Sequence, residues 1–304
     1  MSAIYLVGDN PLAYYLAAQL QSAGLRTIVL LSRQKAESFL DTDGISIKED
    51  RSLTQKRHRL ETSFLMKEPV RAVIITAYGN NINTMLSSIS KQKIGDSPVA
   101  CFTPIKDLSY LYLLLGENLH PAYFNGYLNY NNQSISVFGR SLSITLCPPT
   151  DRLVDEDLKT IFQSTDLDIH FSNNPMESFW EYFIPYALCS IFSAAENSKI
   201  SELLKDKDQK DKFKPLVDEF CSLAAADRVF LNEKIILKNI YSTPASYIYP
   251  LHQAIASGEK TEFNLLSSII NSAAQQSKTP IPQTNALLKK IYNHIINDIE
   301  ETQA

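Results

Sequence analysis

The stretch AIYLVGDNPLAYYLAAQLQSAGLRTIVLLSR, residues 3–33, decides the fold of this chain. It predicts an apolar strand over residues 3–7, a turn at Gly8, a helix that ends near Gly24 and a second apolar strand over residues 27–31. A strand, a glycine turn, a helix and a second strand form half of a dinucleotide-binding unit, in which the two strands lie side by side and parallel. We therefore expect the following residues to extend this sheet.

The glycine turn departs from the G-x-G-x-x-G fingerprint of dinucleotide sites. The three fingerprint positions are Gly8, Asn10 and Ala13. Alanine is a common third residue, and asparagine tolerates the positive φ that the second position can need, but the Asn10 side chain stands where the phosphates should lie. Asn10 is also a good N-cap and Pro11 a good first helical residue, so a helix start without any phosphate explains the same residues. Both interpretations stay open at this point.

Composition limits the classes of protein to which the chain can belong. With 304 residues, of which 44% are hydrophobic and 20% charged, the chain can bury a sizeable core and is expected to form two domains. The formal charge of -4 gives no general electrostatic reason to bind nucleic acid or an anionic membrane. We find no signal-peptide pattern and no apolar run of membrane-spanning length, so we expect a cytoplasmic protein.

The cysteine and histidine residues do not indicate a metal site or a hydrolase. Cys101, Cys147, Cys189 and Cys221 are widely spaced and form no C-x-x-C pair, so we expect reduced core thiols. The five histidines lie in no recognisable nucleophile context, and no cluster has the spacing of metal ligands. The sequence therefore predicts no metal.

Short apolar strands alternate with helical patterns as far as residue 149. The expected strands cover residues 45–47, 70–76 and 99–102, followed by two or three strands within 123–146 that turn at 131–132 and at Gly139-Arg140. The expected helices cover residues 34–40, 80–91 and 108–115. The polar stretch 48–61 has the composition of a solvated loop.

A break at residues 147–150, Cys-Pro-Pro-Thr, is the best candidate domain boundary. Beyond it the pattern predicts a short strand and mostly helices; the strand covers 168–171 and the main helices cover 155–162, 176–196, 213–225, 262–276 and 285–300. We therefore predict an α/β protein with a Rossmann-like parallel-sheet domain at 1–149, of the dinucleotide-binding type, followed by a mostly α-helical domain at 150–304, of the substrate-binding or dimerisation type.

Over nearly its whole length the sequence resembles the ketopantoate reductases (2-dehydropantoate 2-reductases), which are NADPH-dependent enzymes of two such domains. The residues that carry the resemblance are Tyr5-Leu6-Val7-Gly8, Ala23-Gly24, Arg33, Gly44-Ile45, Trp180, the stretch 255–262 (Ile-Ala-Ser-Gly-Glu-Lys-Thr-Glu) and Pro280. The resemblance implies that Arg33, just past the second strand, favours NADPH over NADH by binding the 2′-phosphate. It also implies that Glu262 lies in the cleft between the domains and contacts a small-molecule ligand. Without the family, Glu262 is equally a good acid for the first turn of a helix.

Polar residues of the family pattern are missing at the implied site. The family's general-acid lysine, two residues after the tryptophan, is Tyr182 here, and the amide expected four residues later is Tyr186. Thr76 stands where the family has a lysine beside the cofactor. Thr103, with the proline that follows it, stands where the family has an Asn-Gly pair after the next strand. The resemblance thus implies an NADPH site at which NADPH binds weakly or not at all. This site includes Gly8, Asn10, Ala13, Arg33, Thr76 and Thr103.

Two classes of function stay open on these residues. The first is a divergent NADPH-dependent oxidoreductase of a 2-keto acid, with Tyr182 as acid if a neighbour lowers its pKa, and Glu262 as the other catalytic residue. The second is a non-catalytic protein that keeps the fold and binds a nucleotide or another small ligand. A homodimer is compatible with either.

Overall fold

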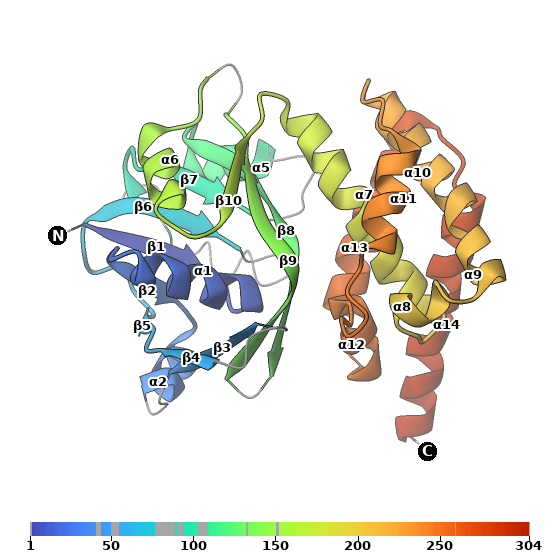
Figure 1. The fold of residues 1–304 in the computed structure, drawn as a ribbon, viewed down its shortest axis with the longest axis horizontal. Helices are drawn as coiled ribbons and strands as arrows, with labels where there is room; N and C mark the ends of the chain where they lie inside the picture. The colour runs from blue at the N-terminus through green and yellow to red at the C-terminus, as the bar shows by residue number, and fades with distance from the viewer. Residues whose placement is uncertain are drawn as a thin grey trace. The chain divides into compact units, whose positions relative to one another are not determined.

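The structure, a computed structural model, describes residues 2–40, 44–49, 55–76, 89, 94–102, 109–131, 133–149, 152–258 and 260–303. The chain divides into two compact units, Met1–Ser178 and Phe179–Ala304 (Figure 1). The first is a sheet with helices and the second is helical, which confirms the predicted fold class. The predicted domain boundary at residue 149 stays a prediction.

The first unit is built on a sheet in the order β4-β3-β9-β8-β7-β6-β1-β2-β5, with β10 paired to β9. Its central pairs, β7-β6-β1-β2, are parallel, as predicted, whereas β8 and β9 form an antiparallel pair. The strands are β1 Ala3–Val7, β2 Thr27–Leu30, β3 Ile45–Glu49, β4 Gln55–His58, β5 Glu61–Ser63, β6 Val70–Ile75, β7 Val99–Cys101, β8 Leu119–Asn131, β9 Ser134–Leu146 and β10 Asp168–Phe171.

Both faces of the central strands are buried, which explains why they read as continuous apolar runs. Along β1, Ile4 and Leu6 join a core cluster that includes α1 residues, while Tyr5 and Val7 join a second cluster on the other face. The helices described in this unit are α1 Pro11–Ser22, α2 Arg33–Leu40, α5 Ser109–Leu115 and α6 Glu156–Gln163 (Figure 1). The helix predicted at 80–91 lies outside the described residues, except for Ile89, which is buried.

Two predictions about loops and turns were wrong. The stretch 48–61 is not one solvated loop, because β4 pairs with β3 as an antiparallel edge strand whose charged side chains remain exposed. Gly139-Arg140 does not turn the chain, since both residues lie within β9. The β8–β9 register passes from Tyr127↔Phe138 to Asn125↔Ser143, and this irregularity accommodates Gly139, which has φ +92°, without ending the strand.

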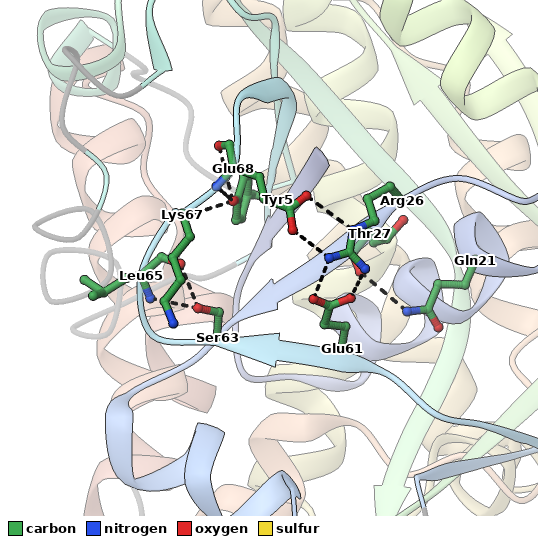
Figure 2. Close-up of polar contacts among 9 residues, drawn as sticks. All are labelled: Tyr5, Gln21, Arg26, Thr27, Glu61, Ser63, Leu65, Lys67 and Glu68. Carbon is green, nitrogen blue, oxygen red and sulfur yellow. Dashed lines mark hydrogen bonds and ion pairs between the residues drawn. The ribbon is translucent and has the colours of Figure 1, made fainter. Parts of the chain in front are cut away.

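Polar contacts tie together the amino-terminal ends of the central strands (Figure 2). Arg26, just before β2, pairs with Glu61 at the start of β5 and with Glu68 just before β6. The buried hydroxyl of Tyr5 accepts hydrogen bonds from the backbone N–H groups of Lys67 and Glu68, at 3.1 and 2.9 Å. The hydrogen bond from Arg26 lowers the pKa of the Glu68 carboxyl. This edge is therefore occupied by structural ion pairs, and the carboxyl ends of the strands lie at the opposite edge.

The second unit packs its helices around large aromatic side chains. Trp180, Phe183, Phe192, Phe213 and Phe220 are fully buried, and the Trp180 indole donates a hydrogen bond of 2.9 Å to Asp227. The helices are α7 Pro175–Ala195, which begins in the first unit, and α8 Ile200–Leu203, α9 Lys207–Asp211, α10 Phe213–Ala226, α11 Glu233–Tyr241, α12 Pro250–Ala256, α13 Thr261–Ser277 and α14 Pro282–Gln303.

Helix α14 begins at Pro282, before the predicted start at residue 285, because another helix supplies its N-terminal cap. The Glu219 carboxylate of α10 accepts hydrogen bonds from the backbone N–H groups of Gln283 and Thr284 and from the Thr284 hydroxyl, at 2.7–2.9 Å. A carboxylate at this place satisfies N–H groups that have no partner within the helix. The contact joins α10 to α14 and fixes the helix start.

Candidate functional site

Asn10 connects the start of α1 to the end of β6. Its side-chain oxygen accepts a hydrogen bond of 2.9 Å from the Ala13 N–H, which makes it the N-cap of α1. Its amide nitrogen donates a hydrogen bond of 2.8 Å to the Thr76 carbonyl. Asn10 has φ -153°, an extended conformation, so its tolerance of positive φ is not used. Its amide thus acts as a structural clamp at the turn that follows Gly8.

Thr76 places a buried hydroxyl beside this turn. The residue directly follows β6, its N–H donates to the Val7 carbonyl at 3.0 Å, and only 2% of it is exposed. Its hydroxyl oxygen has no hydrogen-bond partner among the described residues. A buried unpaired hydroxyl is unfavourable by about 1–3 kcal/mol, so this position is suited to a polar group from a ligand. Thr103, expected at the same site, lies outside the described residues.

Arg33 is the first residue of α2, close after β2, and its side chain is 73% exposed. It donates a hydrogen bond of 3.2 Å to Glu37, and its guanidinium carbon lies 5.0 Å from the centre of the Phe64 ring. A planar guanidinium that stacks on a ring keeps its other donors in a defined plane. The cation expected near the ribose is thus present, exposed and partly oriented.

Asp9 and Lys35 belong to the same end of the sheet but were missed by the sequence analysis. The Asp9 carboxylate accepts a hydrogen bond of 2.5 Å from the Tyr14 hydroxyl and forms an ion pair with the Lys35 ammonium. Burial and the neighbouring Asp9 raise the pKa of Tyr14 above its ordinary value. The sequence indicated these two residues only weakly, because all that marks them is that Asp9 follows the turn glycine and Lys35 lies two residues after Arg33.

In the helical unit, α7 and α13 bring together three of the residues named by the resemblance. Tyr182 and Tyr186 stack with ring centres 5.8 Å apart and planes inclined by 12°, as expected for bulky rings one turn apart. Glu262, in the first turn of α13, is 6% exposed, and its carboxylate accepts a hydrogen bond from the Tyr186 hydroxyl. Glu262 is therefore more than a surface acid at a helix start.

The electrostatics of this cluster do not favour tyrosine as an acid. Burial, together with the negative charge of Glu262, raises the pKa of Tyr182 above its ordinary value of 10.0. A general acid is most effective when its pKa lies near the working pH, so this shift weakens proton donation by Tyr182. Ser190, one turn beyond Tyr186, is fully buried, and its hydroxyl has no hydrogen-bond partner among the described residues.

The described residues include no group of three or more His, Cys, Asp or Glu side chains that could hold a metal ion. No helix within the described ranges is long and apolar enough to cross a membrane. None of the four cysteines forms a disulfide within the described ranges, and burial raises the pKa of Cys147 to about 11. Such thiols are protonated near neutral pH and are poor nucleophiles.

Comparisons with known proteins agree with the resemblance predicted from the sequence. Residues 174–294 match the family model "Ketopantoate reductase PanE/ApbA C terminal". No curated protein matches the chain. The family-model match confirms the resemblance to the ketopantoate reductases over those residues, and the solved structures described next share the fold.

Solved structures share the fold over nearly the whole chain, at low sequence identity. D-mandelate dehydrogenase, in a ternary structure with NADH and anilino(oxo)acetate, has a TM-score of 0.85 and 16% identity, and the match covers 97% of this chain and 99% of that chain. A PanE/ApbA family ketopantoate reductase from Ralstonia eutropha JMP134 has a TM-score of 0.81, 15% identity and the same coverage. The 2-dehydropantoate 2-reductase from Geobacter metallireducens GS-15 has a TM-score of 0.81 and 14% identity, with 96% and 99% covered.

Proposed function

We propose that this chain, whose residues 174–294 belong to the ketopantoate reductase C-terminal domain family, is a divergent oxidoreductase-like protein that binds NADPH in preference to NADH through its first unit. The observation that carries the proposal is the buried, unpaired hydroxyl of Thr76 beside Asn10 and the Gly8 turn. Since ligands of open α/β sheets bind outside the carboxyl ends of the strands, this is where a polar ligand group is expected.

The residues present fit a nicotinamide dinucleotide, although with less charge than the family pattern. Gly8 is the fingerprint residue for the tight turn and Ala13 the one for close packing of β1 and α1, and both are buried. Thr76 offers a neutral hydroxyl in place of an ammonium, and Arg33 offers an exposed guanidinium for a 2′-phosphate. A bound nicotinamide would supply hydride chemistry. This chain's residues would bind and orient its phosphates.

We further propose that the protein does not reduce ketopantoate at a useful rate. Positioned general acid catalysis contributes on the order of a hundred- to ten-thousand-fold, and the raised pKa of Tyr182 makes it a poor substitute for lysine. The Tyr186 hydroxyl already donates a hydrogen bond to Glu262, so a 2-keto acid would have to compete with that hydrogen bond. Oxidoreduction of another substrate stays compatible with this arrangement.

The second candidate function is a non-catalytic protein that binds a nucleotide or another small ligand. It is favoured by the Tyr182–Tyr186–Glu262 cluster, in which aromatic stacking and a hydrogen bond occupy the side chains named by the resemblance. A cytoplasmic location and a homodimer stay predictions under both candidates. The two functions differ in whether a bound dinucleotide is ever turned over.

Titration with NADPH and NADH, followed by nicotinamide fluorescence, tests the proposal. We expect saturable binding of NADPH, weaker binding of NADH, and loss of this preference in Arg33→Ala. The matched control is Arg26→Ala, because Arg26 precedes β2 whereas Arg33 follows it, and Arg26 is engaged with Glu61 and Glu68. Equal affinity for the two dinucleotides, or an unchanged preference in Arg33→Ala, would contradict the proposal.

A further inference from the structure

An ion pair links the ends of two adjacent strands in the first unit. Asp9 lies in the turn between β1 and α1, and Lys35 lies in the first turn of α2, soon after β2. Since β1 and β2 are paired in parallel, with Val7 opposite Leu30, both residues stand at the same edge of the sheet. In this fold the first turn faces the pyrophosphate and the end of the second strand faces the adenosine ribose. The Lys35 ammonium therefore lies between the two places where a dinucleotide carries phosphate.

Asp9 is held from two sides. The Tyr14 hydroxyl donates to one carboxylate oxygen, and the Lys35 ammonium pairs with the other. Tyr14 is itself buried and packs against the rings of Phe39 and Tyr130, with centres 5.3 Å away in both cases. The Lys35 side chain is mostly exposed, so it can move while Asp9 stays in place.

Thr76 supplies an independent observation at the same edge. Its buried hydroxyl has no partner among the described residues, and the backbone carbonyl of the same residue is joined to the Asp9-Asn10 turn by the Asn10 amide. An unpaired buried polar group next to an exchangeable ion pair is the arrangement expected where a polar ligand completes the hydrogen bonding.

We propose that Lys35 is a specificity-determining residue for a phosphate on the adenosine ribose, and that Asp9 competes with this phosphate for the Lys35 ammonium. The proposal rests on the proposed function, because it concerns the same dinucleotide. A 2′-phosphate exchanges one anionic partner of Lys35 for another, whereas a ligand with a free 2′-hydroxyl leaves the Asp9–Lys35 pair intact. Lys35 thus adds a second cation to Arg33, which is shared with Glu37 and stacked on Phe64.

The test is a double-mutant cycle on the full chain, with 2′,5′-ADP and 5′-AMP as the titrated probes and calorimetry as the readout. We expect Lys35→Ala to weaken the binding of 2′,5′-ADP roughly three- to fivefold, as for loss of one partly exposed charge pair, and to change the affinity for 5′-AMP by no more than about twofold. Asp9→Asn should increase the affinity for 2′,5′-ADP by a similar factor. That gain should vanish in the double variant, since Asp9 acts through Lys35.

The Glu196–Lys290 pair is a matched control, because it is a similarly exposed ion pair in the helical unit. Glu196→Gln and Lys290→Ala should change neither probe's affinity. If the wild type binds 2′,5′-ADP but Lys35→Ala keeps its preference over 5′-AMP, the inference fails while the proposed function stands. If the gain in Asp9→Asn persists without Lys35, Asp9 acts by simple repulsion and the competition is refuted. If neither the wild type nor any variant binds either probe, both the inference and the proposed function are overturned.

Discussion

Substituting Asn10 should lower stability and raise dinucleotide affinity, because its side chain clamps the turn and, on the fingerprint pattern, is expected to stand where the phosphates bind. Asn10→Ala removes the hydrogen bond from Ala13, an N-cap contribution of about 0.5–2 kcal/mol, and the hydrogen bond to Thr76, about 0.5–1.5 kcal/mol. Together these predict a loss of about 2 kcal/mol. For a protein of 304 residues the corresponding fall in Tm is roughly 3 °C.

Asn10→Gly separates the two effects. Glycine caps a helix within a few tenths of a kcal/mol of asparagine, so the main loss is the Thr76 hydrogen bond, about 1 kcal/mol. It also restores the second glycine of the fingerprint and lets the backbone approach the pyrophosphate. One recovered charge-assisted hydrogen bond predicts roughly tenfold tighter NADPH binding or more.

Thermal unfolding and NADPH titration of the same samples provide the assay. Asn10→Ser is the control, because serine retains an N-cap oxygen but lacks the amide that donates to Thr76. We expect it to lose about 1 kcal/mol without the affinity gain of glycine. A Tm for Asn10→Ala within about one degree of the wild type, or an unchanged NADPH affinity for Asn10→Gly, would refute this reasoning.

Three further predictions concern other parts of the molecule. Tyr186→Phe removes one hydrogen-bond donor to the buried Glu262 carboxylate and should lower the free energy of unfolding, measured in urea, by about 1.5–3 kcal/mol; a loss below about 0.5 kcal/mol would contradict this hydrogen bond. Burial lowers the pKa of His120 below 6.5, so below pH 6.5 the unfolded state binds a proton more readily than the folded state, and stability should fall. The free energy of unfolding of His120→Gln, measured at several pH values, should depend less on pH than that of the wild type, and an equal dependence would contradict this prediction. Tyr182→Lys should not restore ketopantoate reduction in a steady-state assay with saturating NADPH, because the Tyr186 ring still occupies the position one helical turn away where the family has an amide. A turnover of about 1 per second would contradict this prediction.

The physical basis of the His120 prediction is its pair of backbone contacts. One ring nitrogen, Nδ1, lies 2.9 Å from the Asn118 carbonyl oxygen, and Nε2 accepts a hydrogen bond of 3.1 Å from the Asp155 N–H. A neutral ring satisfies both contacts, whereas a protonated ring has no nitrogen left that can accept the hydrogen bond from the Asp155 backbone N–H. The histidine is therefore adapted to its neutral form.

The sequence predicted features that depend on neighbouring residues in the chain. The strand, turn and helix over residues 3–24 and the capping capacity of Asn10 follow from short-range spacing, and the structure contains each of them. The edge strand β4 escaped prediction because its four residues, Gln-Lys-Arg-His, are all polar and show no apolar alternation.

Contacts between distant residues could not be predicted in the same way. The Asp9–Lys35 pair requires β1 and β2 to be adjacent, and the Tyr186–Glu262 hydrogen bond spans 76 residues. Each joins side chains whose meeting depends on packing of the folded chain. The sequence could name Glu262 through a family resemblance, but it could not show that a tyrosine donates to its carboxylate.

We propose that the protein binds NADPH but does not reduce ketopantoate. The most direct measurement adds ketopantoate to the wild-type protein saturated with NADPH and follows both nicotinamide fluorescence and NADPH consumption in one sample. We expect enhanced fluorescence of bound NADPH and no consumption above the protein-free rate. Consumption at about 1 per second or faster, typical of an enzyme, would contradict it, as would the absence of any NADPH binding.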